Sequence, residues 1–374
     1  MKTVKFSDVV TRANTKEDRF NTDKIYYVGG EHIDSNEMKI EKRGIIAGST
    51  IGPMFYCGFK SGDILFVTRN PHLRKCGVVD FDGICSEKTF VLETKNRDVL
   101  LQEYLAIVMQ SDDFWNYCEE NKSGGVNYFL NWSTLAEYEF YLPSLAEQKV
   151  LAEKLWAAYE VKQSYLKMIA ATQEMVKSQF VEMFGGEKYC QLELDSLTKE
   201  WIKGQPFKKE NLSDNGNNKC IHYGELFTKY GPIIDKVISS TDDAIIKSSK
   251  YGDVLFPASD VTPDGLARCS ALLEDNVLLG GDIIVLRPNA GILPEYLSWA
   301  INMQKGQLLK RVTGSVVRHM SAKGLKSVTI PVGPVTEQKQ FIDIVKQADK
   351  SISQLRKSID AIDKVIKSLI NENI

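Results

Sequence analysis

The sequence lacks the features that would assign it to several familiar classes of protein. No apolar run approaches the roughly 20 residues needed to cross a bilayer, and no apolar signal region follows the lysines of the N-terminus. Its seven cysteines lie singly, with no CxxC pair and no histidine at metal-ligand spacing. We therefore expect no membrane association, no structural zinc site, and reduced thiols in a cytoplasmic protein.

Catalytic signatures are scarce as well. No Gly-rich phosphate-binding loop is present, and no G-x-G follows an expected strand where a methyltransferase would bind its cofactor. Arg69-Asn70-Pro71-His72 is the nearest match to the clamp of amino-group methyltransferases, but it lacks the second proline and the aromatic residue. The four histidines lie too far apart in the sequence to suggest a triad. We expect no catalytic activity of its own, no metal and no bound cofactor.

An excess of positive charge is also missing. Lysine and arginine together number 47 against 49 acidic residues, which gives a formal net charge of −2. This balance argues against a free-standing nucleic-acid binder, but it permits a DNA reader whose positive charge is partly supplied by a partner.

What the sequence does contain is a long heptad pattern between Thr336 and Ile370. Apolar residues recur there in alternating steps of four and three, without Gly or Pro, which is typical of a coiled-coil seam. The seam consists of Phe341, Val345, Ala348, Ile352, Leu355, Ile359, Ile362, Ile366 and Leu369. A helix of about 35 residues spans roughly 50 Å. Its apolar seam requires a partner helix of similar length.

An internal repeat covers most of the chain. When the sequence is aligned with itself so that Gly62–Phe66 falls on Gly252–Phe256, other segments match in the same register. That register places Glu147-Gln148-Lys149 on Glu337-Gln338-Lys339. Several matches in one register indicate an internal duplication.

The repeat also supplies the partner helix. In the same register, the seam falls on Leu151, Leu155, Ala158, Lys162, Tyr165, Ile169, Thr172, Val176 and Gln179. We expect its apolar face to be widened by Tyr159, Leu166, Met175 and Phe180. This pattern predicts a second long helix from about Ala146 to Phe184, ended by Gly185-Gly186.

The chain should therefore alternate globular units and long helices. The predicted boundaries are 1–143 and 188–331 for the globular units, and 144–187 and 332–374 for the helices. Each unit mixes apolar strand-like runs with short helices, which favours two α/β units with curved sheets in an α+β protein. The predicted strands are 62–68, 89–92, 138–142, 253–256, 282–286 and 327–331, and the predicted short helices are 99–116 and 294–304. The helices should form an antiparallel pair that separates the units, with a pseudo-twofold axis relating the two halves.

One stretch of the first unit allows a catalytic alternative. Asp82, followed by Glu93 and Lys95 after an apolar strand, resembles the carboxylate–lysine arrangement of metal-dependent nucleases. The equivalent stretch of the second unit, Val285–Asn289, has no such residues. A strand end with solvated charges is the simpler interpretation.

Polar and basic loops precede the last strand of each unit, at Lys122–Trp132 and Lys310–Lys323. Small residues let a backbone approach a phosphate, cations and hydroxyls bind it, and Asn, Arg or His can read base edges. Two further surfaces are Arg69–Lys75, with a counterpart around Ser259–Arg268, and Gln205–Lys209. Each of these surfaces alone could be a solvated turn. However, the loop before the last strand recurs in both units with different polar side chains, as expected for two domains that recognise different DNA sequences. The candidate DNA-binding residues are Arg69, His72, Arg74, Lys75, Lys122, Asn127, Tyr128, Asn131, Lys208, Lys209, Arg268, Arg311, Ser315, Arg318, His319 and Lys323.

These features together resemble the specificity subunit of type I restriction–modification systems. The resemblance is carried by Leu142–Gln148 and Ile330–Gln338, each opening a long helix, and by the Gly-Asp-Ile/Val-Leu-Phe strand of each unit. Trp201–Phe207 and Ile221–Glu225 match the usual start of such a unit. The first unit departs from the pattern because Val10–Asn14 lacks a clear Gly-x-x-Phe.

The resemblance implies a non-catalytic DNA reader. Each globular unit would be a target recognition domain for one half of a bipartite duplex target. The paired helices would fix the spacing of the half-sites and dock two methyltransferase subunits, which would carry S-adenosylmethionine and be joined in some complexes by restriction/translocase subunits. The alternative is a coiled-coil scaffold whose globular ends bind proteins. The basic loops in both units favour DNA binding, and the more acidic composition of the first unit favours the scaffold.

Overall fold

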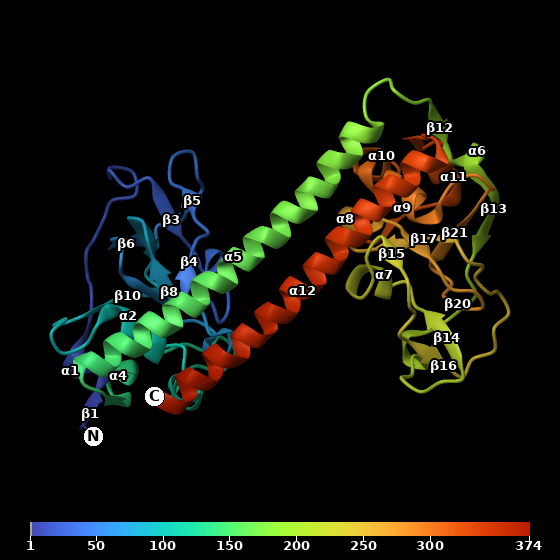
Figure 1. The fold of residues 1–374 in the computed structure, drawn as a ribbon. Coiled ribbons are helices and arrows are strands. Elements are labelled where there is room, and N and C mark those ends of the chain that lie inside the picture. The colour runs from blue at the N-terminus through green and yellow to red at the C-terminus, as the bar shows by residue number, and fades with distance from the viewer. Residues whose placement is uncertain (1) are drawn as a thin grey trace. The chain divides into compact units, whose positions relative to one another are not determined.

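The computed structural model describes residues 2–374. Contacts divide the chain into two compact units, and both long helices contribute to each of them (Figure 1). Unit 1 comprises Met1–Lys167 and Leu355–Ile374, and unit 2 comprises Met168–Gln354. The predicted boundaries set the helices apart from the globular units, whereas the contacts assign part of each helix to each unit.

Unit 1 is built on a five-stranded sheet with the core on both of its faces. Its strands, in spatial order, are β2 (Val10–Arg12), β10 (Thr89–Thr94), β7 (Ile64–Val67), β8 (Cys76–Val79) and β4 (Lys39–Ile40). Ile64 and Phe66 pack into one apolar cluster and Leu65 into another. Because both faces are covered, β7 reads as a continuous apolar run instead of an alternating one.

Smaller sheets complete unit 1. One contains β5 (Gly44–Ile45), β3 (Tyr26–Val28), β9 (Gly83–Ser86) and β6 (Phe55–Phe59), and the other pairs β1 (Lys2–Lys5) with β11 (Glu139–Leu142). The helical elements are α1 (Phe6–Val9), α2 (Gln102–Val108), α3 (Asp112–Glu120), α4 (Trp132–Ala136), η1 (Gly30–His32) and η2 (Pro71–Leu73).

Unit 2 repeats this architecture. Its main sheet has the matching order β13 (Thr198–Lys203), β21 (Ile283–Pro288), β17 (Val254–Pro257), β19 (Ser270–Leu272) and β15 (Ile233–Ile234). In both sheets the last strand is parallel to its neighbour and the other pairs are antiparallel. The shared strand order confirms the internal repeat and the mixed α/β units.

The remaining elements of unit 2 form one three-stranded sheet, two strand pairs and short helices. Its short strands are β12 (Gln191–Glu193), β14 (Asn218–Ile221), β16 (Ser240–Thr241), β18 (Ser259–Asp260), β20 (Leu278–Leu279), β22 (Arg318–His319) and β23 (Thr329–Pro331). Its helices are α6 (Leu194–Leu197), α7 (Glu225–Thr228), α8 (Pro263–Leu266), α9 (Pro294–Met303), α10 (Lys305–Leu309), α11 (Ala322–Lys326) and η3 (Lys209–Asn211).

One predicted element is wrong in extent. The segment 99–116, expected to be a single helix, forms α2 and α3 with a break between them. Ser111 causes the break, because its side chain accepts a hydrogen bond from the Phe114 N–H and caps a new helix. Asp112 and Asp113 in the first turn further stabilise that start.

The two long helices, α5 (Leu145–Phe184) and α12 (Val335–Asn373), confirm the heptad prediction. In unit 1, Tyr159 of α5 and Ile370 of α12 share an apolar cluster. In unit 2, Phe180 of α5 and Phe341 of α12 lie 5.3 Å apart between ring centroids. The beginning of each helix therefore pairs with the end of the other, as the antiparallel prediction requires.

The seam residues of both helices are buried or half-buried. Two of the residues expected to widen the face of α5 do not do so, because Leu166 is 41% and Met175 44% exposed. Tyr159 and Phe180 do pack inside. The helix ends at Phe184, as predicted, and Gly186 follows with φ of +70°. Among residues 2–374, no helix combines the length and the apolarity of a membrane span.

A buried glutamine attaches each long helix to its unit. The Gln148 carbonyl oxygen accepts the Leu101 N–H at 2.9 Å, and its amide donates to the Val99 carbonyl at 2.9 Å. Gln338 accepts the Leu293 N–H at 2.9 Å and donates to the Gly333 carbonyl at 2.8 Å. Both side chains are fully buried. The repeated Glu-Gln motif thus marks where each helix joins its unit.

Candidate nucleic-acid interface

A short hairpin, residues Lys122–Leu130, projects from unit 1 and is called hairpin 1. Ser123 and Phe129 close it by exchanging backbone hydrogen bonds of 2.8 and 2.9 Å. Gly124 has φ of +98°, and a Cβ there would come within 2.6 Å of the Asn127 carbonyl oxygen. Only glycine fits this turn without strain. The tip residue, Val126, is 94% exposed.

Hairpin 1 joins two candidate surfaces that are far apart in the sequence. The Asn70 N–H donates to the Tyr128 carbonyl and the Leu130 N–H to the Thr68 carbonyl, both at 2.9 Å. The Arg69 guanidinium lies 5.2 Å from the centre of the Phe129 ring. The segment Arg69–Lys75 and hairpin 1 therefore form one continuous surface.

Most cations of this surface already have partners. Lys122 forms an ion pair with Glu119 at 2.6 Å, and its ammonium lies 4.5 Å from the centre of the Tyr128 ring. Lys75 donates to the Gly30 carbonyl at 2.6 Å. Asn127 and Asn131 are exposed and have no hydrogen-bonded side-chain partner within the described chain. Unit 1 therefore presents mainly amide and aromatic groups.

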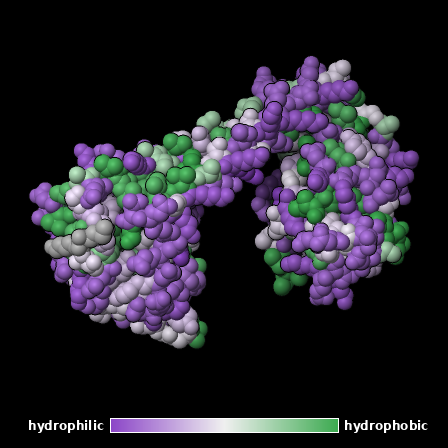
Figure 2. Space-filling view, turned by 60° about the horizontal axis from the view of Figure 1, so that its bottom comes forward, coloured by the Kyte–Doolittle hydropathy of each residue, from purple (hydrophilic) through white to green (hydrophobic). Residues whose placement is uncertain are grey.

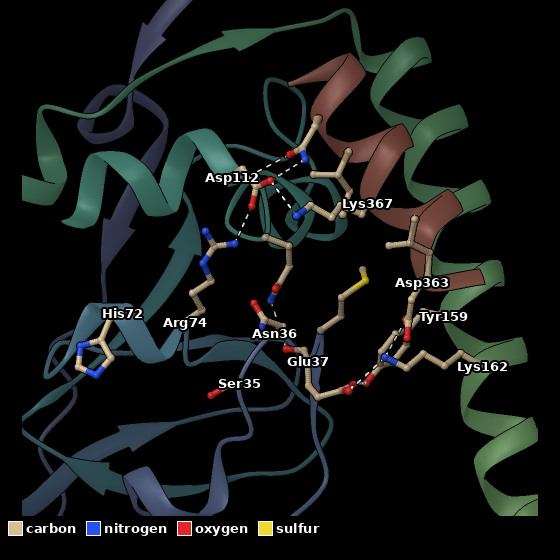
Figure 3. Close-up of a pocket in the computed structure, with 15 residues that line it drawn as sticks. Ser35, Asn36, Glu37, His72, Arg74, Asp112, Tyr159, Lys162, Asp363 and Lys367 are labelled. Carbon is tan, nitrogen blue, oxygen red and sulfur yellow. Dashed lines mark hydrogen bonds and ion pairs between the residues drawn. The ribbon is translucent and has the colours of Figure 1, made fainter. Parts of the chain in front are cut away.

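The segment Asn70–Arg74 has an unusual backbone. Asn70 and Arg74 flank η2 with φ of 52° and 49°, in the left-handed region. The His72 side chain is exposed and points away from that of Arg74 (Figure 3). Arg74 faces inward and pairs with Asp112 at 2.6 Å. The two predicted site residues therefore differ in their contacts, although both line the same cavity.

Unit 2 carries the matching structure, residues Arg311–Met320, called hairpin 2. Thr313 and His319 exchange backbone hydrogen bonds of 3.0 and 2.8 Å. Gly314 has φ of +92°, and a Cβ there would collide with the Val317 carbonyl oxygen. β22 in this hairpin pairs with β18, as hairpin 1 pairs with the segment after β7. Val316, at the position equivalent to Val126, is 81% exposed.

Hairpin 2 presents more free charge than hairpin 1. Arg311, Ser315, His319 and Lys323 are exposed, and no acidic side chain pairs with Arg311 or Lys323 within residues 2–374. The Arg318 guanidinium, by contrast, is engaged within the hairpin, because it folds back and donates to the Gly314 carbonyl. Ser321 caps α11 by accepting the Gly324 N–H at 3.1 Å, which holds Lys323 beside the hairpin.

The third candidate surface lies elsewhere in unit 2. The buried Gln205 side chain accepts the Ile246 N–H at 2.8 Å and donates to the Ala244 carbonyl at 2.9 Å, so it fixes a loop. Lys208 and Lys209 are exposed. Burial lowers the pKa of nearby His222, and the charge of Lys209 adds to this effect.

Arg268 is not part of hairpin 2. Its guanidinium donates to the Phe227 carbonyl at 3.3 Å, at the α7 side of the unit. The sequence predicted that Arg268 belongs to the unit 2 equivalent of the Arg69–Lys75 surface. In the structure, the segment that pairs with hairpin 2 in the equivalent way is β18.

The carboxylates of the nuclease alternative have other partners. Asp82 accepts the Ser61 N–H at 2.9 Å and pairs with Lys24 at 3.0 Å, and both contacts lower its pKa. Glu93 pairs with Lys60 at 3.1 Å, and Lys95 donates to the Ser7 carbonyl at 2.6 Å. No group of three or more potential metal ligands occurs among the described residues. These contacts fit the simpler interpretation of charges at strand ends.

Sequence reasoning missed Asp112, which contacts the Arg69–Lys75 segment through Arg74. The available signal was Ser111-Asp112-Asp113, a helix start that the continuous apolar pattern concealed.

Most of the sequence matches one protein family. Residues 1–164 and 191–364 match the family described as "Type I restriction modification DNA specificity domain". The putative type I restriction enzyme MjaX specificity subunit of Methanocaldococcus jannaschii is 28% identical over 94% of this chain and 87% of its own length. The MjaVIII specificity subunit of the same organism is 24% identical, but that match covers only 40% of this chain and 35% of the relative.

Solved structures show the same fold. The S subunit of a type I restriction–modification system from M. genitalium aligns with a TM-score of 0.61 at 13% identity, over 100% of this chain and 96% of its own. A chain from a study of complex assembly and conformational transition of a type I system aligns with a TM-score of 0.58 at 20% identity, over 99% and 96%.

Proposed function

This chain belongs to the type I restriction–modification DNA specificity family, and we propose that it selects the DNA target of such a system without catalysing a reaction itself. The observation that carries the proposal is the pair of hairpins. Each has the same backbone and the same attachment to its unit, yet the exposed side chains differ. A shared hairpin backbone that carries different polar side chains is suited to two units that recognise different short DNA sequences.

Each unit would bind one half of a bipartite duplex target. Hairpin 1 with the Arg69–Lys75 segment would contact one half-site, and hairpin 2 with β18 and Lys323 the other. Cations such as Arg311 and Lys323 would bind phosphates, while Asn127 and His319 can form hydrogen bonds to base edges.

The long helices would set the distance between the half-sites. This is supported by their uninterrupted course, since α5 and α12 each supply residues to both units. Readers joined by a rigid element meet the duplex at a fixed helical phase. Removing one heptad within Val161–Ala171 should abolish recognition of the native target, whereas removing matched heptads from both helices should shorten the spacer. An unchanged spacer in the doubly shortened protein would contradict this role.

The same helices would dock two modification subunits that carry S-adenosylmethionine and methylate adenine, and restriction/translocase subunits can join them. Support comes from the solvent-facing side of α5, which exposes more large apolar residues than that of α12. In α5 these are Leu145, Val150, Val161, Leu166, Met168, Met175 and Val181, and in α12 they are Val335 and Val365. Figure 2 shows hydrophobic residues at the surface along the long helices, among hydrophilic ones. Exposed apolar groups of this kind mark protein-binding surfaces.

The decisive experiment is methylation mapping of a genome that carries this chain together with the methyltransferase encoded beside it. We expect one bipartite motif, methylated in both halves and separated by a fixed spacer. The competing proposal is a coiled-coil scaffold with protein-binding ends. It would be supported if the chain and its methyltransferase together never preferred one duplex over another at any salt concentration.

A further inference from the structure

A polar cavity of about 540 Å³ lies within unit 1, and His72 and Arg74 of the η2 loop are among its lining residues. Five parts of the chain meet there: the Ser35–Met38 loop, the η2 loop, the start of α3 with Gln110, one stretch of α5, and the last turns of α12 (Figure 3). The network on its wall links the end of α12 to a loop that is proposed to contact DNA.

Asp112, the first residue of α3, is the centre of this network. Its carboxylate accepts hydrogen bonds from Arg74 at 2.6 Å and from the Asn371 amide at 2.9 Å, and it pairs with Lys367 at 3.2 Å. The Asp112 N–H donates in return to the Asn371 side-chain oxygen at 3.0 Å. One half-buried carboxylate thus joins the η2 loop to two residues of α12.

Arg74 occupies a conformation that needs such support. Left-handed backbone is unfavourable for a residue with a Cβ, and Arg74 adopts it with φ of 49°. Its carbonyl accepts the Asn36 N–H at 3.0 Å, and its own N–H donates to the Pro71 carbonyl at 2.9 Å. With the guanidinium held by Asp112, the loop is fixed at Arg74, while the His72 side chain remains exposed. Strained backbone persists where its surroundings over-determine it.

A second set of contacts fixes α12 itself. Lys162 of α5 pairs with Asp363 of α12 at 3.0 Å and with Glu37 at 3.2 Å, and the Tyr159 hydroxyl donates to Glu37 at 2.9 Å. Burial alone would lower the pKa of Lys162, but these carboxylates outweigh it and the pKa is raised. The last turns of α12 are therefore held at a defined place within unit 1.

The repeat offers a matched comparison in unit 2. Gln110 in unit 1 and Asn302 in unit 2 perform the same task, donating to the carbonyls of Cys76 and Cys269. The charged network has no such counterpart. Lys177, which the register of the repeat aligns with Lys367, pairs only with Glu174 of its own helix. The network is a feature of unit 1.

We propose that Lys367 and Asn371 of α12, acting through Asp112 and Arg74, position the His72 loop for DNA recognition by unit 1. Arg74 is then a positioning residue rather than a DNA contact. The inference rests on the proposed function, because it assumes that this loop reads DNA.

The test is competition binding by the chain in complex with its methyltransferase, with duplexes altered in one half-site or the other. The Lys367→Ala/Asn371→Ala variant should lose about tenfold of its discrimination at the half-site read by unit 1, and none at the other. The matched control is Lys177→Ala/Lys364→Ala, which removes two exposed lysines outside the network and should behave as the unmodified protein. Arg74→Ala and Asp112→Asn should resemble the first variant and leave the salt dependence of binding unchanged.

Each outcome separates the two ideas. If the unmodified complex shows no half-site preference, the proposed function fails. If it shows a preference and the Lys367→Ala/Asn371→Ala variant keeps it at both half-sites, the positioning role is wrong. Equal loss at both half-sites would indicate a general structural defect and also overturn the proposal. A salt slope reduced by about one in Arg74→Ala alone would assign that residue to a phosphate instead.

Discussion

Hairpins 1 and 2 have the same backbone but use their charges differently. Near hairpin 1, Lys122 is paired with Glu119 and Arg74 with Asp112. In and beside hairpin 2, Arg311 and Lys323 are exposed and have no acidic partner within the described chain. Duplication preserved the closing hydrogen bonds and the glycine of each turn, while the surrounding charges diverged.

This difference suggests unequal contributions to binding. Free cations attract phosphates whatever the sequence, whereas neutral polar and aromatic groups discriminate between bases. We expect unit 2 to supply most of the salt-dependent affinity, and unit 1 to contribute more to discrimination than to attraction.

The largest predicted effect is on stability, and it concerns the buried glutamine that attaches a long helix to each unit. Gln148→Ala and Gln338→Ala should each lower the free energy of unfolding by about 2 kcal/mol, because each removes a fully buried side chain and leaves a half-buried backbone N–H, that of Leu101 or Leu293, without a partner. Chemical denaturation followed by hydrogen exchange would locate the loss in the unit concerned. Gln173→Ala, which changes an exposed residue of α5, is the control and should stay within about 0.5 kcal/mol.

The turn glycines test whether the hairpins are equivalent in shape. Gly124→Ala and Gly314→Ala should each cost about 1–2 kcal/mol locally, because alanine is strained at these φ values. Each should weaken discrimination at one half-site only. Gly125→Ala is a suitable control, since a Cβ there meets nothing within 4 Å. Loss at both half-sites from either variant would show that the units do not read DNA independently.

The unequal charges should appear in the salt dependence. Arg311→Ala/Lys323→Ala should weaken binding to all duplexes and reduce the salt slope by about two. Lys122→Ala should change the slope by less than one, because Glu119 already neutralises that lysine. Binding isotherms at several salt concentrations would measure both values. The comparison fails if Lys122→Ala has the larger effect.

The smallest effect is a pH dependence confined to unit 1. Arg74, followed by Lys367 and Asn371, lowers the pKa of Asp112 below its usual range. A carboxyl whose pKa is lower in the folded state stabilises the protein above its unfolded pKa, about 3.9. That stability is lost as the pH falls through the folded value. Between pH 5 and 3, the free energy of unfolding should therefore fall further for the unmodified protein than for Asp112→Asn. The difference should be less than about 1 kcal/mol, because the pair is partly exposed.

Much of the fold could be predicted because its signals are periodic. Phe341, Val345 and the rest of the seam specify a helix and its partner at once, and the register of the internal repeat identifies the partner. The heptad pattern alone could not establish how far the apolar face extends. Leu166 and Met175 continue the apolar character of α5 but remain at its surface.

The candidate site was less predictable because its parts come from distant segments. Nothing local indicates that the Asn70 N–H bonds to the Tyr128 carbonyl, so two surfaces that looked separate form one. Arg74 was grouped with the DNA contacts because it is basic and lies in a loop. Its left-handed backbone and its inward orientation toward Asp112 depend on α3 and α12, which lie far along the chain.

The sharing of both helices between the units has a consequence for the order in which the protein can fold during synthesis. Met38, Ile107 and Leu155 are made early, yet Ile370, which completes their cluster, is made only after the whole of unit 2. The first unit to leave the ribosome is thus the last to be finished. Until then it exposes an apolar surface that invites aggregation or a substitute helix from another chain.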